Sequence, residues 1–296
     1  MTCLPRSSAL AGTTGQTPVP LRRTPRTHTR AFTLIETLVT ISLIGALLSI
    51  LLPALSSARG SAQQTVCASN LRQLQFANNF FASEHQGSYI PGAVDIQFSN
   101  LKRWHGSREH VGEPFDAASG VITPYLDDAL ISVRTRRCPT FAPALDELSR
   151  QGAGFENSSG GYGYNNAYVG AVRQPGPDHT WTISRDDQGA KRTRFEHPSE
   201  TLAFADAAFA SSQGVGGLIE YSFAEPNFWP DYPGARPNPS IHFRHAGKAN
   251  VVWLDDHVSS ETRTRTWAGL GYGVDSSTVG LGWFAHRDSN DLFDYN

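Results

Sequence analysis

Residues of the types that bind metal ions gather near the carboxyl end of this chain. They are His245, Asp255, Asp256 and His257, and Asp206 is a further candidate from an earlier apolar run. Aspartate oxygens alone suit calcium, whereas aspartates together with imidazole nitrogens suit zinc. The alternative is that Asp255 and Asp256 form a hairpin turn to which His245 hydrogen-bonds across a sheet. We therefore expect no obligatory cofactor and keep calcium as the candidate ion.

The common sequence signatures of catalysis are missing. The chain has no Gly-x-Ser-x-Gly elbow, no His-Glu-x-x-His pair and no Gly-x-x-x-x-Gly-Lys-Ser/Thr phosphate loop. We predict that it is not an enzyme. Two alternatives stay open: a membrane-anchored surface binding module, such as an adhesin or glycan binder, and a metal-dependent envelope enzyme. The six tryptophans could include sugar-stacking surfaces, but core packing is their more usual role.

A single carboxylate, Glu36, stands at the entrance of the uncharged stretch 37–58. A helix of that length would span about 33 Å, enough for the hydrocarbon core of a bilayer. A carboxylate at membrane depth is costly unless it is paired. Glu36 therefore either pairs with a positive charge or caps the start of the helix, where acids are favoured.

Residues 1–31 form a basic leader with no apolar run. Its charges are all arginines: Arg6, Arg22, Arg23, Arg26 and Arg30. Without them the formal net charge falls from −2 to −7, which does not favour a nucleic-acid partner. Since the apolar stretch follows the leader, this is not an ordinary secretory signal. The arginines favour a single-pass topology with a cytoplasmic amino end and an outward-facing remainder.

The run from Ala31 to Glu36, Ala-Phe-Thr-Leu-Ile-Glu, resembles the cleavage and methylation motif of type IV prepilins and type II secretion pseudopilins. The resemblance implies that prepilin peptidase cuts after Ala31 and methylates the new amine of Phe32. Glu36 and Pro53 are then residues 5 and 22 of the mature chain, where the family places a glutamate and often a kinking proline. Ala31 departs from the usual glycine, and the leader is longer than is common.

This resemblance also implies partners and a location. Glu36 would pair with a Phe32 amine, its own or a neighbour's, and so set the register of packed copies. The implied partners are prepilin peptidase, copies of the chain itself, other pseudopilins and the inner membrane. The domain after the helix would be periplasmic or extracellular. Type II pseudopilins often bind calcium, which gives the candidate ion a family precedent.

The pattern predicts one long helix over residues 32–86, with a transmembrane half at about 34–55. Pro53 should bend it, because proline lacks an amide proton and clashes with the preceding turn. Beyond it, Leu74, Ala77 and Phe81 recur at helical spacing and predict an amphipathic half.

Residues 87–296 read as a soluble β-rich domain. The best hairpin spans residues 248–260, with Asp255 and Asp256 at its turn. We predict an α+β, pilin-like fold in which the long helix packs on a carboxyl-terminal antiparallel β-sheet domain.

Two cysteines remain after the leader, Cys67 and Cys138, and they suit one disulfide in an oxidising compartment or two separately buried thiols. Both stand in motifs that resemble pseudopilin-like proteins of Planctomycetes and related bacteria. These motifs are Cys-x-x-Asn-Leu from Cys67, Cys138-Pro139, Tyr-x-Tyr-Asn from Tyr162, and His245 followed after nine residues by Asp255-Asp256-His257-Val258. Asp256 replaces the glycine of that last motif.

Together these features indicate a structural pseudopilin or pilin-like subunit. We expect it to be cleaved, methylated and assembled into a type II secretion pseudopilus or a type IV pilus-like filament.

Overall fold

The computed structural model describes residues 32–96, 98–126, 135–152, 154–177, 180–285 and 287–295. The leader, including the expected cleavage residue Ala31, lies outside these residues. The chain divides into two compact units, Met1–Leu51 and Leu52–Asn296. Helix α1 (Leu34–Glu84) begins in the first unit and ends in the second, and it continues through Pro53.

In the first unit, every described side chain from Phe32 to Leu51 is exposed. Beyond Glu36, only serine and threonine side chains interrupt the apolar surface, and several of their hydroxyls bond to the preceding helical turn. Thr37 Oγ1, for example, donates to the carbonyl of Leu34 at 2.8 Å. Such bonds cover polar groups that lipid could not satisfy.

In the second unit, α1 buries one face. The buried residues are Cys67, Asn70, Leu71, Leu74, Gln75, Ala77, Asn78, Phe81 and Ala82. The helix ends where Gln86 and Gly87 adopt positive φ of 55° and 82°. The amide of Gly87 donates to the carbonyl of Ala82 at 2.8 Å, which closes the last turn as glycine commonly does. The helix therefore ends two residues before the limit of 86 that the sequence predicts.

The main sheet has the order β11-β10-β6-β3, and all neighbouring strands are antiparallel. Its strands are β3 (Tyr162–Tyr164), β6 (Leu202–Asp206), β10 (Lys248–Trp253) and β11 (Val258–Thr262). The predicted hairpin is β10–β11, paired from Lys248↔Thr262 to Val252↔Val258. Its turn places Asp256 at φ 74°, a left-handed conformation that aspartate tolerates better than most residues.

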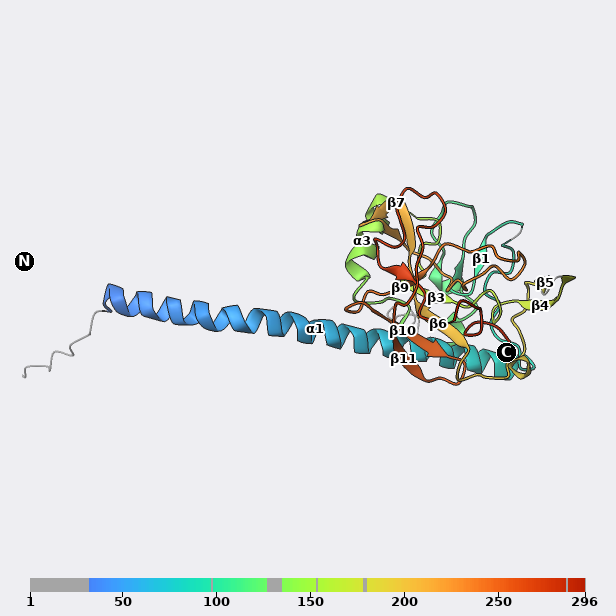
Figure 1. The fold of residues 1–296 in the computed structure, drawn as a ribbon, viewed down its shortest axis with the longest axis horizontal. Coiled ribbons are helices and arrows are strands. Elements are labelled where there is room, and N and C mark those ends of the chain that lie inside the picture. The colour runs from blue at the N-terminus through green and yellow to red at the C-terminus, as the bar shows by residue number, and fades with distance from the viewer. Residues whose placement is uncertain are drawn as a thin grey trace, which may run out of the picture. The chain divides into compact units, whose positions relative to one another are not determined.

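The second half of α1 lies along this sheet (Figure 1). Gln64 Nε2 donates to Ser260 Oγ at 2.8 Å near one end of the contact. Gln75 Nε2 donates to the carbonyl of Leu254 at 3.1 Å further along. Both faces of β10 are covered, because every side chain from Ala249 to Leu254 is buried. Burying an aliphatic side chain of this size stabilises the fold by about 1.5–3 kcal/mol.

Shorter elements surround this layer. The remaining strand pairs are β1–β2 (Lys102–Arg103, Gly106–Ser107), β4–β5 (Val172–Pro175, Trp181–Arg185), β7–β8 (Phe209–Val215, Leu218–Ile219) and β9–β12 (Ile241–His242, Leu281–Gly282). The helical elements are η1 (Ala117–Ser119), η2 (Thr123–Tyr125), α3 (Ala142–Gln151) and η4 (Arg192–Arg194). The described structure thus has one long amino-terminal apolar helix and a mostly antiparallel sheet domain, consistent with a pilin-like α+β fold.

Three of the six tryptophans, Trp104, Trp253 and Trp283, belong to the core. Trp104 Nε1 donates to the carbonyl of Ser222 at 2.8 Å, and Trp283 Nε1 donates to that of Glu225 at 2.9 Å. These rings therefore have packing roles, as buried indoles with a bonded N–H usually do.

Glu225 is a buried carboxyl that should make stability depend on pH. Burial raises its pKa to about 7, against the lowering effect of a 2.6 Å hydrogen bond from Tyr221. Between about pH 4.5 and 7 the folded chain keeps this proton while the unfolded chain loses it. The free energy of unfolding should therefore fall by about 3 kcal/mol as pH rises through that window.

We expect Glu225→Gln to remove this part of the pH dependence. The measurement is chemical unfolding of the full chain in detergent at pH 5 and pH 8, with the exposed Glu196→Gln as the matched control. Equal pH dependence in wild type and Glu225→Gln would contradict the expectation.

Candidate functional site

The start of α1 is held by a reciprocal pair of hydrogen bonds. Glu36 Oε2 accepts from the amide and the hydroxyl of Thr33, both at 2.8 Å. Thr33 Oγ1 in turn accepts from the amide of Glu36 at 3.3 Å. This is a capping box, which the Thr-x-x-Glu spacing allows. In a single chain, Glu36 therefore satisfies the helix start, the second of the two roles considered for it.

The neighbouring Phe32 is 74% exposed, and Glu36 is exposed as well. Among the described residues, the hydrogen bonds of the Glu36 carboxylate all use Oε2. The amino end of the helix thus presents an accessible carboxylate four residues from the expected new amine. Behind it, α1 is long and apolar enough to cross a membrane.

The metal-ligand candidates separate into two places. Asp206, at the end of β6, and His245, before β10, lie together, with 3.1 Å between Asp206 Oδ2 and His245 Nε2. Asp255 and His257 lie at the β10–β11 turn, where Asp255 Oδ1 is 2.6 Å from His257 Nδ1.

Asp256, at the same turn, accepts a 2.5 Å bond from Asn79 of α1. The five residues therefore form no single site, because β10 separates His245 from the turn by about 20 Å of extended chain.

Two cysteines, Cys67 and Cys138, lie beside Asp206 and His245. The ligand atoms of Cys67, Cys138, Asp206 and His245 all lie within 4.8 Å of one another, and all four residues are buried. The two sulfurs are 2.7 Å apart, both as free thiols. The sequence allows the cysteines either one disulfide or two separately buried thiols, and it groups Asp206 and His245 with the residues of the turn. Nothing in the spacing of the chain linked the two pairs.

Two buried polar atoms of this cluster have no hydrogen bond of good geometry among the described residues. Asp206 Oδ2 accepts from the amide of Asn250 at 2.8 Å, but Asp206 Oδ1 and His245 Nε2 are buried without a hydrogen-bond partner in the part of the chain that the structure describes. The 3.1 Å contact between the histidine and the aspartate thus lacks hydrogen-bond geometry. Arg244 adds a positive charge nearby and donates from Nη2 to the carbonyls of Gly161 and Ala207.

These surroundings shift the acidities of the four groups. Burial raises the pKa of Asp206. For Cys138, burial raises the pKa, but the Cys67 thiol, Arg244 and His245 outweigh it and lower the pKa to about 3. The hydrogen bond with Cys138 raises the pKa of Cys67, since two thiols in contact do not both ionise readily. Burial lowers the pKa of His245, but Asp206 and Cys138 outweigh it and raise it to about 9.

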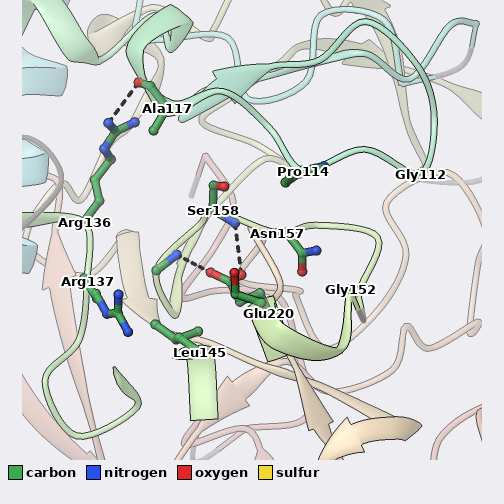
Figure 2. Close-up of a pocket in the computed structure, with 12 residues that line it drawn as sticks. Gly112, Pro114, Ala117, Arg136, Arg137, Leu145, Gly152, Asn157, Ser158 and Glu220 are labelled. Carbon is green, nitrogen blue, oxygen red and sulfur yellow. Dashed lines mark hydrogen bonds between the residues drawn. The ribbon is translucent and has the colours of Figure 1, made fainter. Parts of the chain in front are cut away.

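A cavity of about 460 Å³ lies elsewhere in the domain, beside α3 (Figure 2). Glu220 lies in it, and its carboxylate accepts from the amides of Ser158 at 3.0 Å and Gly160 at 2.8 Å. Arg136 donates from Nη2 to the carbonyl of Ala117 at 2.9 Å. Among the described lining residues Glu220 is the only carboxyl, and none is a histidine or cysteine. We therefore find no acid–base or nucleophilic pair there.

Comparison with known proteins gives a match at the start of α1. A family model for the prokaryotic N-terminal methylation motif matches residues 26–52, which include the expected cleavage position, Glu36 and the first half of α1. No curated protein and no solved structure matches the chain. The match supports a type IV pilin-like or pseudopilin-like protein that is processed by prepilin peptidase and assembles with pilin-like subunits.

Proposed function

We propose that this chain is a structural subunit of a type II secretion pseudopilus or a type IV pilus-like filament. Prepilin peptidase removes residues 1–31 and methylates the amine of Phe32. The mature chain then joins copies of itself and other pseudopilins through α1. Its contribution is assembly, and it performs no turnover.

The observation that carries this proposal is that the family model for the methylation motif matches residues 26–52. The described side chains of this segment from Phe32 to Leu51 are all exposed. An apolar helix without a buried face needs an apolar surrounding, which lipid supplies before assembly and neighbouring helices supply after it. The leader arginines favour insertion into the inner membrane with the amino end in the cytoplasm.

The second half of α1 also carries apolar side chains that the domain leaves uncovered. Val66, Phe76 and Phe80 are 49%, 43% and 64% exposed, while Leu74 and Ala77 between them are buried against the domain. Exposed aromatic residues on a helix whose other face is buried mark a second contact surface. Neighbouring subunits of a filament would cover it.

The direct test is the amino terminus of the chain recovered from cell membranes. We expect a peptide that begins at Phe32 and carries one methyl group on its amine, because Ala31 is small enough to fit the peptidase. Mass spectrometry of the proteolysed chain measures both features at once. In cells that lack prepilin peptidase, the chain should keep its leader. A mature chain that begins elsewhere, or an unmodified Phe32, would contradict the proposal.

A further inference from the structure

The four buried residues Cys67, Cys138, Asp206 and His245 converge from parts of the fold that are distant in sequence. Cys67 lies on α1, Cys138 on the segment before α3, Asp206 at the end of β6 and His245 before β10. Their exposed fractions are 0%, 0%, 0% and 4%. We propose that these four side chains bind one structural zinc ion that fastens α1 to the sheet.

The unpaired atoms of the cluster argue for a ligand that contacts all four groups. A disulfide between the cysteines would leave Asp206 Oδ1 without a hydrogen bond from any described residue, and His245 Nε2 with only its poorly aligned 3.1 Å contact to Asp206 Oδ2. A buried polar atom without a well-aligned hydrogen bond destabilises the fold. A zinc ion would accept electron pairs from the carboxylate and the imidazole as well as from both sulfurs, and would remove this destabilisation.

The charge of the site also fits a divalent cation. Two thiolates and one carboxylate carry three negative charges, which a zinc ion and the neighbouring Arg244 would neutralise together. His245 would bind as the neutral imidazole, and each thiol would lose its proton to solvent on binding. Four protein ligands without an open position are typical of structural zinc, whereas calcium takes six to eight oxygen ligands. This cluster has one carboxyl, so it does not fit calcium.

Binding requires one local adjustment. With zinc–sulfur bonds of about 2.3 Å, the two sulfurs of a tetrahedral site lie about 3.8 Å apart. They are 2.7 Å apart here, so they must separate by about 1 Å around the ion. Rotation of either side chain about its Cα–Cβ bond would achieve this.

The test is the metal content of the full chain, purified in detergent without chelators and measured by elemental analysis and native mass spectrometry. We expect one zinc ion per chain. Chelator treatment should remove it and leave Cys67 and Cys138 as thiols that alkylate, and added zinc chloride, but not calcium chloride, should restore it. Asp206→Asn and His245→Gln should weaken the affinity for zinc by about tenfold or more, since even the loss of an outer-shell partner can weaken it that much.

Asp255→Asn and His257→Gln at the β10–β11 turn are the matched controls and should keep the zinc. A metal-free wild-type chain whose mass is lower by two hydrogens would overturn the proposal in favour of a disulfide. Two free thiols that take up no added zinc would overturn it as well. Both measurements are made on wild type, so they hold even if a variant fails to fold.

Discussion

The Glu36→Gln chain is expected to be cleaved and methylated normally and yet to be depleted from filaments by about tenfold or more, since a loss of 1.4 kcal/mol per contact is already a factor of ten. Glutamine at this position keeps the capping box, because its side-chain oxygen can still accept from Thr33. It removes only the charge that we propose to pair with a Phe32 amine. The measurement is the ratio of filament-bound to membrane-bound subunit after shearing.

The controls separate the two roles of Glu36. Ser42→Ala removes a hydroxyl that bonds to the carbonyl of Leu38 on the same exposed helix, and it should assemble normally. Thr33→Ala weakens the cap while keeping the Glu36 charge, so it should assemble better than Glu36→Gln. Normal assembly of Glu36→Gln together with failure of Thr33→Ala would show that the residue acts only as a cap.

The Arg103→Met chain should unfold with a free energy lower than that of wild type by about 3–5 kcal/mol. Arg103 and Glu156 form an ion pair whose side chains are 2% and 3% exposed, with 2.7 Å between Arg103 Nη2 and Glu156 Oε1. Arg103 Nε also lies within 3.1 Å of both carboxylate oxygens, and Ser222 Oγ donates to Oε2 at 2.6 Å. Without the guanidinium, the Glu156 carboxylate stays buried with the Ser222 hydroxyl as its hydrogen-bond donor. Because the site is closed to water, the negative charge is then not compensated.

Chemical unfolding of the full chain in detergent measures this loss. Arg185→Met is the matched control, because Arg185 and Asp187 are about half exposed and their pair should contribute about 0–1 kcal/mol. Adding Glu156→Gln to Arg103→Met should recover part of the stability, since it removes the uncompensated charge. Equal losses for Arg103→Met and Arg185→Met would contradict the role of the buried pair.

Local patterns in the sequence predicted the long helix and the main hairpin. An uncharged stretch followed by apolar residues at helical spacing forms one helix from Leu34 to Glu84, with Pro53 inside it. The hairpin follows from the short, mostly apolar run of β10 and the Asp255-Asp256 turn after it. Both depend on neighbours within a few residues, so composition and spacing were sufficient to define them.

The small strand pairs were harder to predict. Within the apolar stretch 218–223, Leu218–Ile219 forms strand β8 and Phe223 forms a separate bridge with Tyr164. Between them, Glu220 accepts from the amides of Ser158 and Gly160. Strands of two residues, such as β1 and β9, have no measurable period. Their pairing depends on where the surrounding loops place them.

The amino-terminal motif, the apolar helix and hence the pilin-like interpretation could be predicted from the amino-acid sequence alone, because they depend on residues adjacent in the chain. Only the tertiary structure joined Cys67 and Cys138 to Asp206 and His245, and separated His245 from the turn that follows it by ten residues. The physical reason is the same in both cases. A helix and an antiparallel sheet bring distant segments together, while an extended strand carries near neighbours in sequence to opposite ends.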